Sequence, residues 1–203
     1  MKSLTKSKIW FFAIGQFGWS LLSGIISNWM VYIYQPDAAG STLFIPQTRI
    51  VFGIFTIIGA ITAFGRIFDA ITDPWIASLS DRCKSKQGRR IPFLKWASIP
   101  LAASTVLVFC APVSGISWIN TLWLLLFIAC YYLAITAYCT PYNALISELG
   151  HTQKDRLAIS TAISFTFIVG TAVSMQAANV WGIFIAHGMT RMMAIRVTFV
   201  IFA

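Results

Sequence analysis

The sequence predicts an all-α, multi-pass membrane protein, and three observations carry that prediction. Hydrophobic residues make up 58% of the 203 positions and charged residues only 10%, too few to cover a soluble domain of this size. The apolar residues fall into segments long enough to cross a bilayer as helices. The basic residues gather before the first segment and after the second and fourth, as they do in proteins that cross a membrane several times.

The distribution of basic residues also predicts the orientation. Eleven Lys and Arg residues lie on one side of the expected membrane, and three (Arg49, Arg191 and Arg196) lie on the other. Because cytoplasmic loops carry the excess of Lys and Arg, we expect a cytoplasmic N-terminus. The net charge of +9 therefore reports topology, and we expect the lipid bilayer, rather than nucleic acid, as the partner of the chain.

The first half of the chain holds three expected helices. The first, residues 9–34, is longer than the apolar region of a signal peptide, so it should stay attached. A stretch containing Pro, Gly and Ser, residues 35–49, leads to the second helix, residues 50–79, which ends at a basic loop. The third, residues 93–111, stops before Pro112, because a proline disfavours helical geometry in the residue before it.

The second half holds two more complete helices, over residues 119–146 and 157–185, on either side of a loop of mixed charge. A last apolar segment, residues 192–203, has too few residues to cross a bilayer as a helix. We therefore expect residues 1–203 to be one helix bundle, truncated in its sixth helix, of a longer protein.

Three charged residues lie inside the second expected helix. Arg66, Asp69 and Asp73 are three and four residues apart, so they share one face of a helix. If Leu79 lies near the membrane surface, Asp69 lies roughly 15 Å deep, near the centre of the bilayer. A charge facing lipid there would cost about 2.5–3.5 kcal/mol, so this face should meet protein or water. One alternative is an Arg66–Asp69 pair that only locks helices together, but it leaves Asp73 unexplained.

Polar residues share one face in three other expected helices. They are Gln16, Ser20, Ser23 and Ser27; then Tyr132, Thr136, Cys139 and Asn143; then Ser160, Ser164, Thr171 and Ser174. Small polar residues also let membrane helices pack closely, which is the alternative for any one of these faces. Together with the charged face, they predict an aqueous cavity shared by four helices, with the helix over residues 93–111 outside it.

The pattern Gly-Arg-x-x-Asp-x-x-Thr-Asp-Pro at residues 65–74, followed by Ser-Asp-Arg at 80–82 and Gly-Arg-Arg-Ile-Pro at 88–92, resembles a known family. It is similar to the glycoside–pentoside–hexuronide:cation symporters, a branch of the major facilitator superfamily that includes melibiose permease. The resemblance implies two six-helix halves that work by alternating access, of which this chain would be the N-terminal half. It also implies a bacterial inner (plasma) membrane protein that is monomeric at full length.

The resemblance assigns a cation site. It implies that Asp69 and Asp73 bind Na⁺ or H⁺, with help from Thr72 and Thr136, and the residues do not choose between the two ions. Arg66 would balance the charge of the two acids when the cation leaves. Where melibiose permease has charged groups near its sugar, this chain has Ser20, Cys139 and Ser164, so the expected pocket is less charged.

The sugar would bind against the polar faces. The candidate sugar-binding residues are Trp19, Ser20, Tyr132, Cys139, Asn143 and Ser164. Ion pairs between cytoplasmic loops would close an inner gate, although solvated surface charge is the alternative. The candidate gate residues are Asp81, Arg82, Arg89, Arg90, Glu148 and Arg156.

The sequence thus predicts a cation-coupled sugar symporter that needs no cofactor beyond its coupling ion. No nucleophile–base pair, phosphate loop or metal motif suggests an enzyme, and the four cysteines lack metal-ligand spacing. Two alternatives remain: a proton-driven exporter or exchanger of the same superfamily, and a membrane scaffold or sensor that transports nothing.

Overall fold

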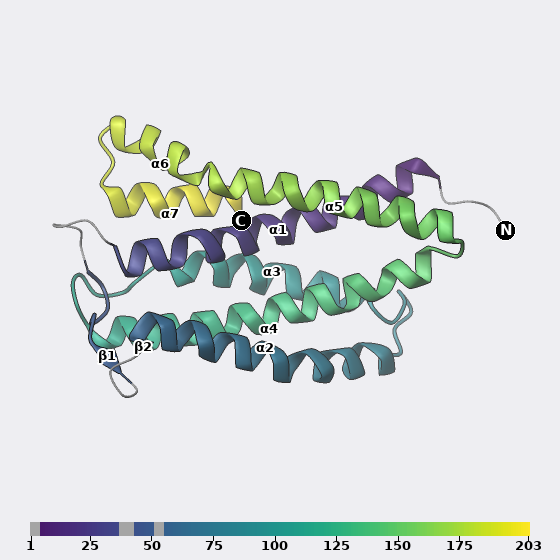
Figure 1. Cartoon of the computed structure of the whole chain (residues 1–203), viewed down its shortest axis with the longest axis horizontal. Coiled ribbons are helices and arrows are strands. Elements are labelled where there is room, and N and C mark those ends of the chain that lie inside the picture. The colour runs from purple at the N-terminus through teal and green to yellow at the C-terminus, as the bar shows by residue number, and fades with distance from the viewer. Residues whose placement is uncertain (1–4, 37–42, 51–54) are drawn as a thin grey trace.

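A computed structural model describes residues 5–36, 43–50 and 55–203 of the chain. It is an elongated bundle in which the helices run side by side along one axis (Figure 1). The helices are α1 (Lys6–Tyr34), α2 (Ile57–Arg82), α3 (Ile91–Val108), α4 (Trp118–Leu149), α5 (Gln153–Met175), α6 (Ala177–Ala186) and α7 (Arg191–Phe202). The predicted all-α fold class is confirmed, with one pair of two-residue strands, β1 (Arg49–Ile50) and β2 (Phe55–Thr56), as its β structure in the described ranges.

Four stretches within the described residues are long and apolar enough to cross a membrane. They are α1, α3, α4, and α5 together with α6. The helix α2 has a similar length, 26 residues, but it carries the charged face described above. Residues 37–42, in the expected loop between the first two helices, lie outside the described ranges.

The second helix begins later than predicted, at Ile57 and not at residue 50. Arg49 and Ile50 pair antiparallel with Thr56 and Phe55, so they belong to β1 and β2. Thr56 has extended backbone angles, and its hydroxyl accepts the amide hydrogen of Gly59 at 3.2 Å. This is the geometry of a helix N-cap, which fixes the start of α2 one residue later. The predicted residues 51–54 lie outside the described ranges.

The helix predicted over residues 157–185 is two helices, α5 and α6, that meet at Gln176. In an uninterrupted helix the carbonyl of Ser174 would accept an amide four residues on, but the indole nitrogen of Trp29 donates to it at 2.8 Å. The Asn28 side chain also donates to the Ser174 hydroxyl at 3.4 Å. Trp29 of α1 therefore bonds to a backbone carbonyl at the end of α5, and Asn28 bonds to a side chain beside it.

Three helix pairs build the frame of the bundle. The helix α1 packs along α5, and α4 packs against both α2 and α3. Glycines bring α1 and α5 close together: a Cβ atom on Gly24 would overlap the Ser174 side chain, and one on Gly170 would overlap Ser20. Such close contact is typical of small residues between membrane helices. The helices α1, α2 and α4 surround the cavity described below.

Candidate functional site

A cavity of about 280 Å³ lies between α1, α2 and α4, and we call it the central cavity. Its lining residues are Trp19, Ser23, Ile26 and Ser27 from α1; Arg66, Asp69 and Asp73 from α2; and Tyr131, Tyr132, Ile135, Thr136, Cys139, Thr140 and Asn143 from α4. The polar face predicted for residues 132–143 therefore lines the cavity as a whole, whereas α3 contributes nothing to it.

The polar face predicted on α5 does not line the central cavity, which corrects the expectation of four contributing helices. Ser174 is fully buried between α1 and α5, so close packing explains it. Ser164 lines a neighbouring hollow of about 400 Å³, which we call the side hollow. Trp19 and Asn143 line both spaces, so the two adjoin along α1 and α4.

Two of the three aspartates of α2, Asp69 and Asp73, each accept a hydrogen bond from a threonine of α4. The Thr136 hydroxyl donates to Asp69 Oδ1 at 2.6 Å, and the Thr140 hydroxyl donates to Asp73 Oδ1 at 3.3 Å. The first bond has the short length of a charge-assisted hydrogen bond. The two aspartates are four residues apart in α2, and the two threonines are four residues apart in α4. One turn of α2 therefore lies against one turn of α4.

The role of Thr140 was missed by sequence reasoning, although a signal was present. Thr136 was expected at the cation site, and Thr140 follows it by the same four residues that separate Asp69 from Asp73. Two packed helices with matching one-turn spacing bring both pairs into register. The spacing itself could have predicted the second threonine.

Arg66 lies in the central cavity but forms no ion pair with either aspartate. Within the described ranges, the ion pairs shorter than 4 Å join Arg89 or Arg90 to acids elsewhere. The Arg66 guanidinium instead lies over the ring of Tyr132, 5.9 Å from its centroid, in a cation–π contact. Gly65 makes room for that ring, since a Cβ atom there would overlap it. The arginine therefore leaves both carboxylates facing neutral hydroxyls.

Two expected site residues are packed between helices. The Thr72 side chain is buried, and its hydroxyl lies 3.0 Å and 3.2 Å from the backbone carbonyls of Phe68 and Asp69, to which it donates. At 100° per residue, Thr72 and Asp73 lie on opposite sides of Asp69, so Thr72 turns away from the cavity. Ser20 is buried against Gly170 and donates to the carbonyl of Phe17 at 3.0 Å. Neither residue lines the central cavity.

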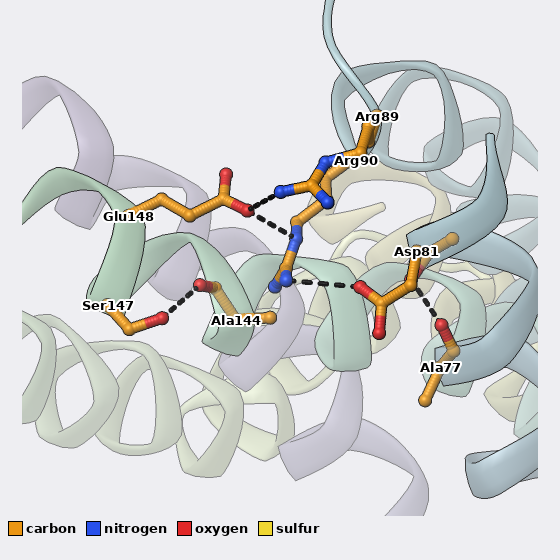
Figure 2. A network of polar contacts seen from close by, with 8 residues as sticks. Ala77, Asp81, Arg89, Arg90, Ala144, Ser147 and Glu148 are labelled. Atoms are coloured by element: carbon orange, nitrogen blue, oxygen red, sulfur yellow. Dashed lines mark hydrogen bonds and ion pairs between the residues drawn. The ribbon is translucent and has the colours of Figure 1, made fainter. Parts of the chain in front are cut away.

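Four of the six expected gate residues form one cluster, the loop network of Asp81, Arg89, Arg90 and Glu148 (Figure 2). Arg90 Nη2 lies 3.2 Å from Asp81 Oδ1, and Arg90 Nε lies 3.1 Å from Glu148 Oε1. Arg89 Nη2 adds a contact of 3.0 Å to the same Glu148 oxygen. The Arg90 side chain is only 11% exposed, whereas that of Arg89 is 57% exposed. The network thus ties the ends of α2 and α4 to the loop before α3.

The turn before these arginines needs a glycine. Gly88 has a φ of +101°, a backbone conformation that residues with a Cβ atom rarely adopt. The two remaining gate candidates lie outside the network: Arg156 Nε donates to the carbonyl of Gly150 at 2.8 Å, and Arg82 ends α2 with no ion pair within the described ranges. Arg156 therefore helps to satisfy the C-terminal end of α4.

Comparison with known proteins decides the family. The family described as "MFS/sugar transport protein" matches residues 11–203, nearly the whole chain. The chain belongs to this family. MFS stands for the major facilitator superfamily, so this membership confirms the predicted relationship to melibiose-permease-like transporters. The chain is therefore a multi-pass integral membrane protein. Its family consists of transporters, not of enzymes.

Several MFS relatives are named as symporters or sugar transporters. The "Uncharacterized symporter sll1374" of Synechocystis is 29% identical over 185 residues, which are 85% of this chain and 31% of the relative. The "Sodium-dependent lysophosphatidylcholine symporter 1-A" of Danio rerio is 30% identical over 117 residues, 55% of this chain and 22% of the relative. The "Isoprimeverose transporter" of Lactiplantibacillus pentosus is 22% identical over 163 residues, 80% of this chain and 31% of the relative. The chain thus spans less than a third of these relatives.

Proposed function

We propose that this MFS chain is the N-terminal bundle of a cation-coupled sugar symporter. One observation carries the proposal: Asp69 and Asp73 line the central cavity, are hydrogen-bonded only to neutral threonines, and have no ion-pair partner within the described ranges. Two acids with one nearby arginine leave an excess of negative charge, which a bound cation would neutralise. Names of relatives, a sodium-dependent symporter among them, support cation coupling.

The oxygen atoms at the cavity wall suit a hard cation. Carboxylate and hydroxyl oxygens are preferred by hard ions, whereas thiolate and imidazole suit transition metals. Asp69 and Asp73 would supply the charged ligands, and Thr136 and Thr140 would supply neutral ones by rotating their hydroxyl hydrogens away. Na⁺ fits this donor set, and a proton on one carboxylate is the alternative. When the cation leaves, Arg66 would swing from the Tyr132 ring toward the acids.

The rest of the central cavity supports an uncharged, polar substrate. Ser23, Ser27 and Asn143 provide hydrogen-bonding groups that match sugar hydroxyls, and Trp19 and Tyr132 provide aromatic rings beside them. The sugar would bind here, next to Cys139, and would extend into the side hollow toward Ser164. The name of the isoprimeverose transporter, a sugar-transporting relative, favours the same substrate class.

The loop network would close the inner gate. Its acids are partly exposed, 58% for Asp81 and 37% for Glu148, so each ion pair is worth only about 0–1 kcal/mol. Such pairs can break and re-form during transport. We propose that this end of the bundle faces the cytoplasm of a bacterial inner membrane, and that a second bundle, in a monomeric protein, covers the open face of the central cavity.

Coupled uptake into proteoliposomes tests the proposal. The protein expressed from its complete reading frame should accumulate a radiolabelled glycoside when a Na⁺ or H⁺ gradient is imposed, and sugar should in turn drive uptake of ²²Na⁺ or of protons. Sugar efflux driven by an inward proton gradient would instead indicate the exporter. Absence of any gradient-driven flux would favour the scaffold, and uptake of lysophosphatidylcholine but not of sugar would reassign the substrate.

A further inference from the structure

A third hollow lies between the N-terminal parts of α1 and α5, and we call it the lysine groove. It has a volume of about 760 Å³ and shares no lining residue with the central cavity or the side hollow. Its walls come from the first turns of both helices, with Ile9 and Leu157 among them. Trp10 meets Phe165 edge to face, with ring centroids 5.8 Å apart. The lysine groove therefore has mainly apolar walls, which include the aromatic rings of Trp10 and Phe165.

Two lysines lie at the edge of the lysine groove. Lys6 and Lys154 both line the groove, and no Asp or Glu does. Neither ammonium group forms an ion pair within the described parts of the chain. The nearest acid in sequence, Asp155, is buried and accepts a hydrogen bond from the Thr152 hydroxyl at 2.7 Å. The positive charge at this end of the groove is thus uncompensated.

The direction of the helices adds to this charge. Both α1 and α5 begin at the same end of the bundle, so their N-termini lie side by side (Figure 1). The N-terminus of a helix carries a partial positive charge. The first turn of α1 has no acidic residue, whereas that of α5 holds Asp155, so this contribution comes from α1. Trp10 is 49% exposed one turn from that end, which is the usual place of a tryptophan at a membrane interface. An anion at headgroup depth would therefore be favoured here.

We propose that the lysine groove binds one anionic phospholipid. Its phosphate would lie between Lys6 and Lys154, and an acyl chain would lie along Leu157 and Phe165. A zwitterionic lipid would bring its own cationic group next to the two ammonium groups, and a free phosphate would leave the apolar walls uncovered. Only a molecule with a negative head and an apolar tail matches both features. This site is independent of the solute that the protein transports.

Native mass spectrometry of the purified full chain, in micelles holding equal amounts of phosphatidylglycerol and phosphatidylcholine, tests the charge of the site. The unmodified protein should retain one phosphatidylglycerol with a preference of roughly 25-fold, since each lysine near a lipid surface contributes about fivefold. The double variant Lys6→Gln/Lys154→Gln should lose most of that preference. The matched control, Lys84→Gln/Lys86→Gln, removes two exposed lysines of the loop before α3 and should keep it.

A second variant tests the apolar wall. Ala158→Trp places a large side chain in the groove at an exposed position, so it should displace the lipid while both lysines remain. Glycerol 3-phosphate at millimolar concentration should not displace the lipid, because it lacks the tail. The proposal is overturned if both lipids bind equally, if the control pair loses as much preference as the groove pair, or if glycerol phosphate competes or Ala158→Trp has no effect.

Discussion

At the middle of the α2–α4 pair, Asp69 and Asp73 receive hydrogen bonds from threonine hydroxyls, whereas at one end of the same pair Asp81 and Glu148 face arginines. The middle cluster has both acids on α2, whereas the end cluster has one acid on α2 and one on α4, and only the end cluster pairs its acids with basic groups. Its partly exposed ion pairs cost little to break, which suits contacts that open and close. We propose that the uncompensated acids in the middle bind a cation that is released during transport. This difference in charge balance distinguishes the proposed inner gate from the proposed cation site.

Removing an acid from the middle should have the largest effect. Asp69→Asn and Asp73→Asn each lower the negative charge of the central cavity, so the affinity for the coupling cation should fall roughly 30-fold or more, the equivalent of about 2 kcal/mol. Concentrative sugar uptake should disappear. Asp81→Asn is the matched control, since it removes one acid from the loop network, and it should leave cation affinity within about twofold. Equal losses in all three variants would erase the distinction between the two clusters.

The threonines should rank in the order of their hydrogen bonds. Thr136→Val removes the 2.6 Å bond to Asp69 and should raise the cation concentration needed for half-maximal uptake about tenfold. Thr140→Val removes a bond of 3.3 Å to the exposed Asp73, so its effect should be about threefold. Thr136→Ser keeps the hydroxyl and should restore most of the affinity. An effect of Thr136→Ser as large as that of Thr136→Val would assign Thr136 to packing alone.

Close packing beside the ion site can be tested with glycine. Gly65→Ala drives a methyl group into the Tyr132 ring that supports Arg66, so it should destabilise the protein by about 1–3 kcal/mol. Gly182→Ala, in α6, has open space around its position and should be neutral or stabilising by up to about 1 kcal/mol. Thermal unfolding in detergent measures both. If Gly65→Ala unfolds at the same temperature as the unmodified protein, the position of the Tyr132 ring does not require a glycine at residue 65.

Substitutions in the loop network should have the smallest effects, and the effect should be larger for the arginine that contacts both acids. Arg90→Gln removes contacts to both Asp81 and Glu148, so it should raise the rate at which a cytoplasmic maleimide labels Cys139 about fivefold. Arg89→Gln removes one contact of a side chain that is 57% exposed and should change the rate by less than about twofold. The measurement uses a protein in which every cysteine except Cys139 is replaced by alanine. The reverse order would contradict the central place of Arg90.

Much of this arrangement could be predicted from spacing and charge. The helical repeat placed Asp69 and Asp73 on one face of α2, and the polar pattern placed Tyr132, Thr136 and Asn143 together on α4. These predictions succeed because a straight helix fixes which side chains share a face. The loop network was also expected, since opposite charges meet near the ends of α2 and α4.

The rest depended on contacts between helices that spacing alone does not determine. Ser20 and Ser174 belong to polar faces, yet Gly170 and Gly24 draw them into the α1–α5 contact. At the break before α6, Trp29 of another helix donates to the carbonyl of Ser174 in α5, a contact that the spacing of α5 alone does not predict. A polar residue in a membrane helix can line water or pack against a glycine, and its own position does not distinguish the two.

The most direct test of the central claim is the ratio of cation to sugar carried by Asp69→Asn and by the unmodified protein in the same proteoliposomes. The account predicts a fixed ratio for the unmodified protein, and sugar exchange without accompanying Na⁺ or H⁺ movement for the variant. If Asp69→Asn and Asp73→Asn both keep the full ratio, the coupling ion binds elsewhere and the account is wrong.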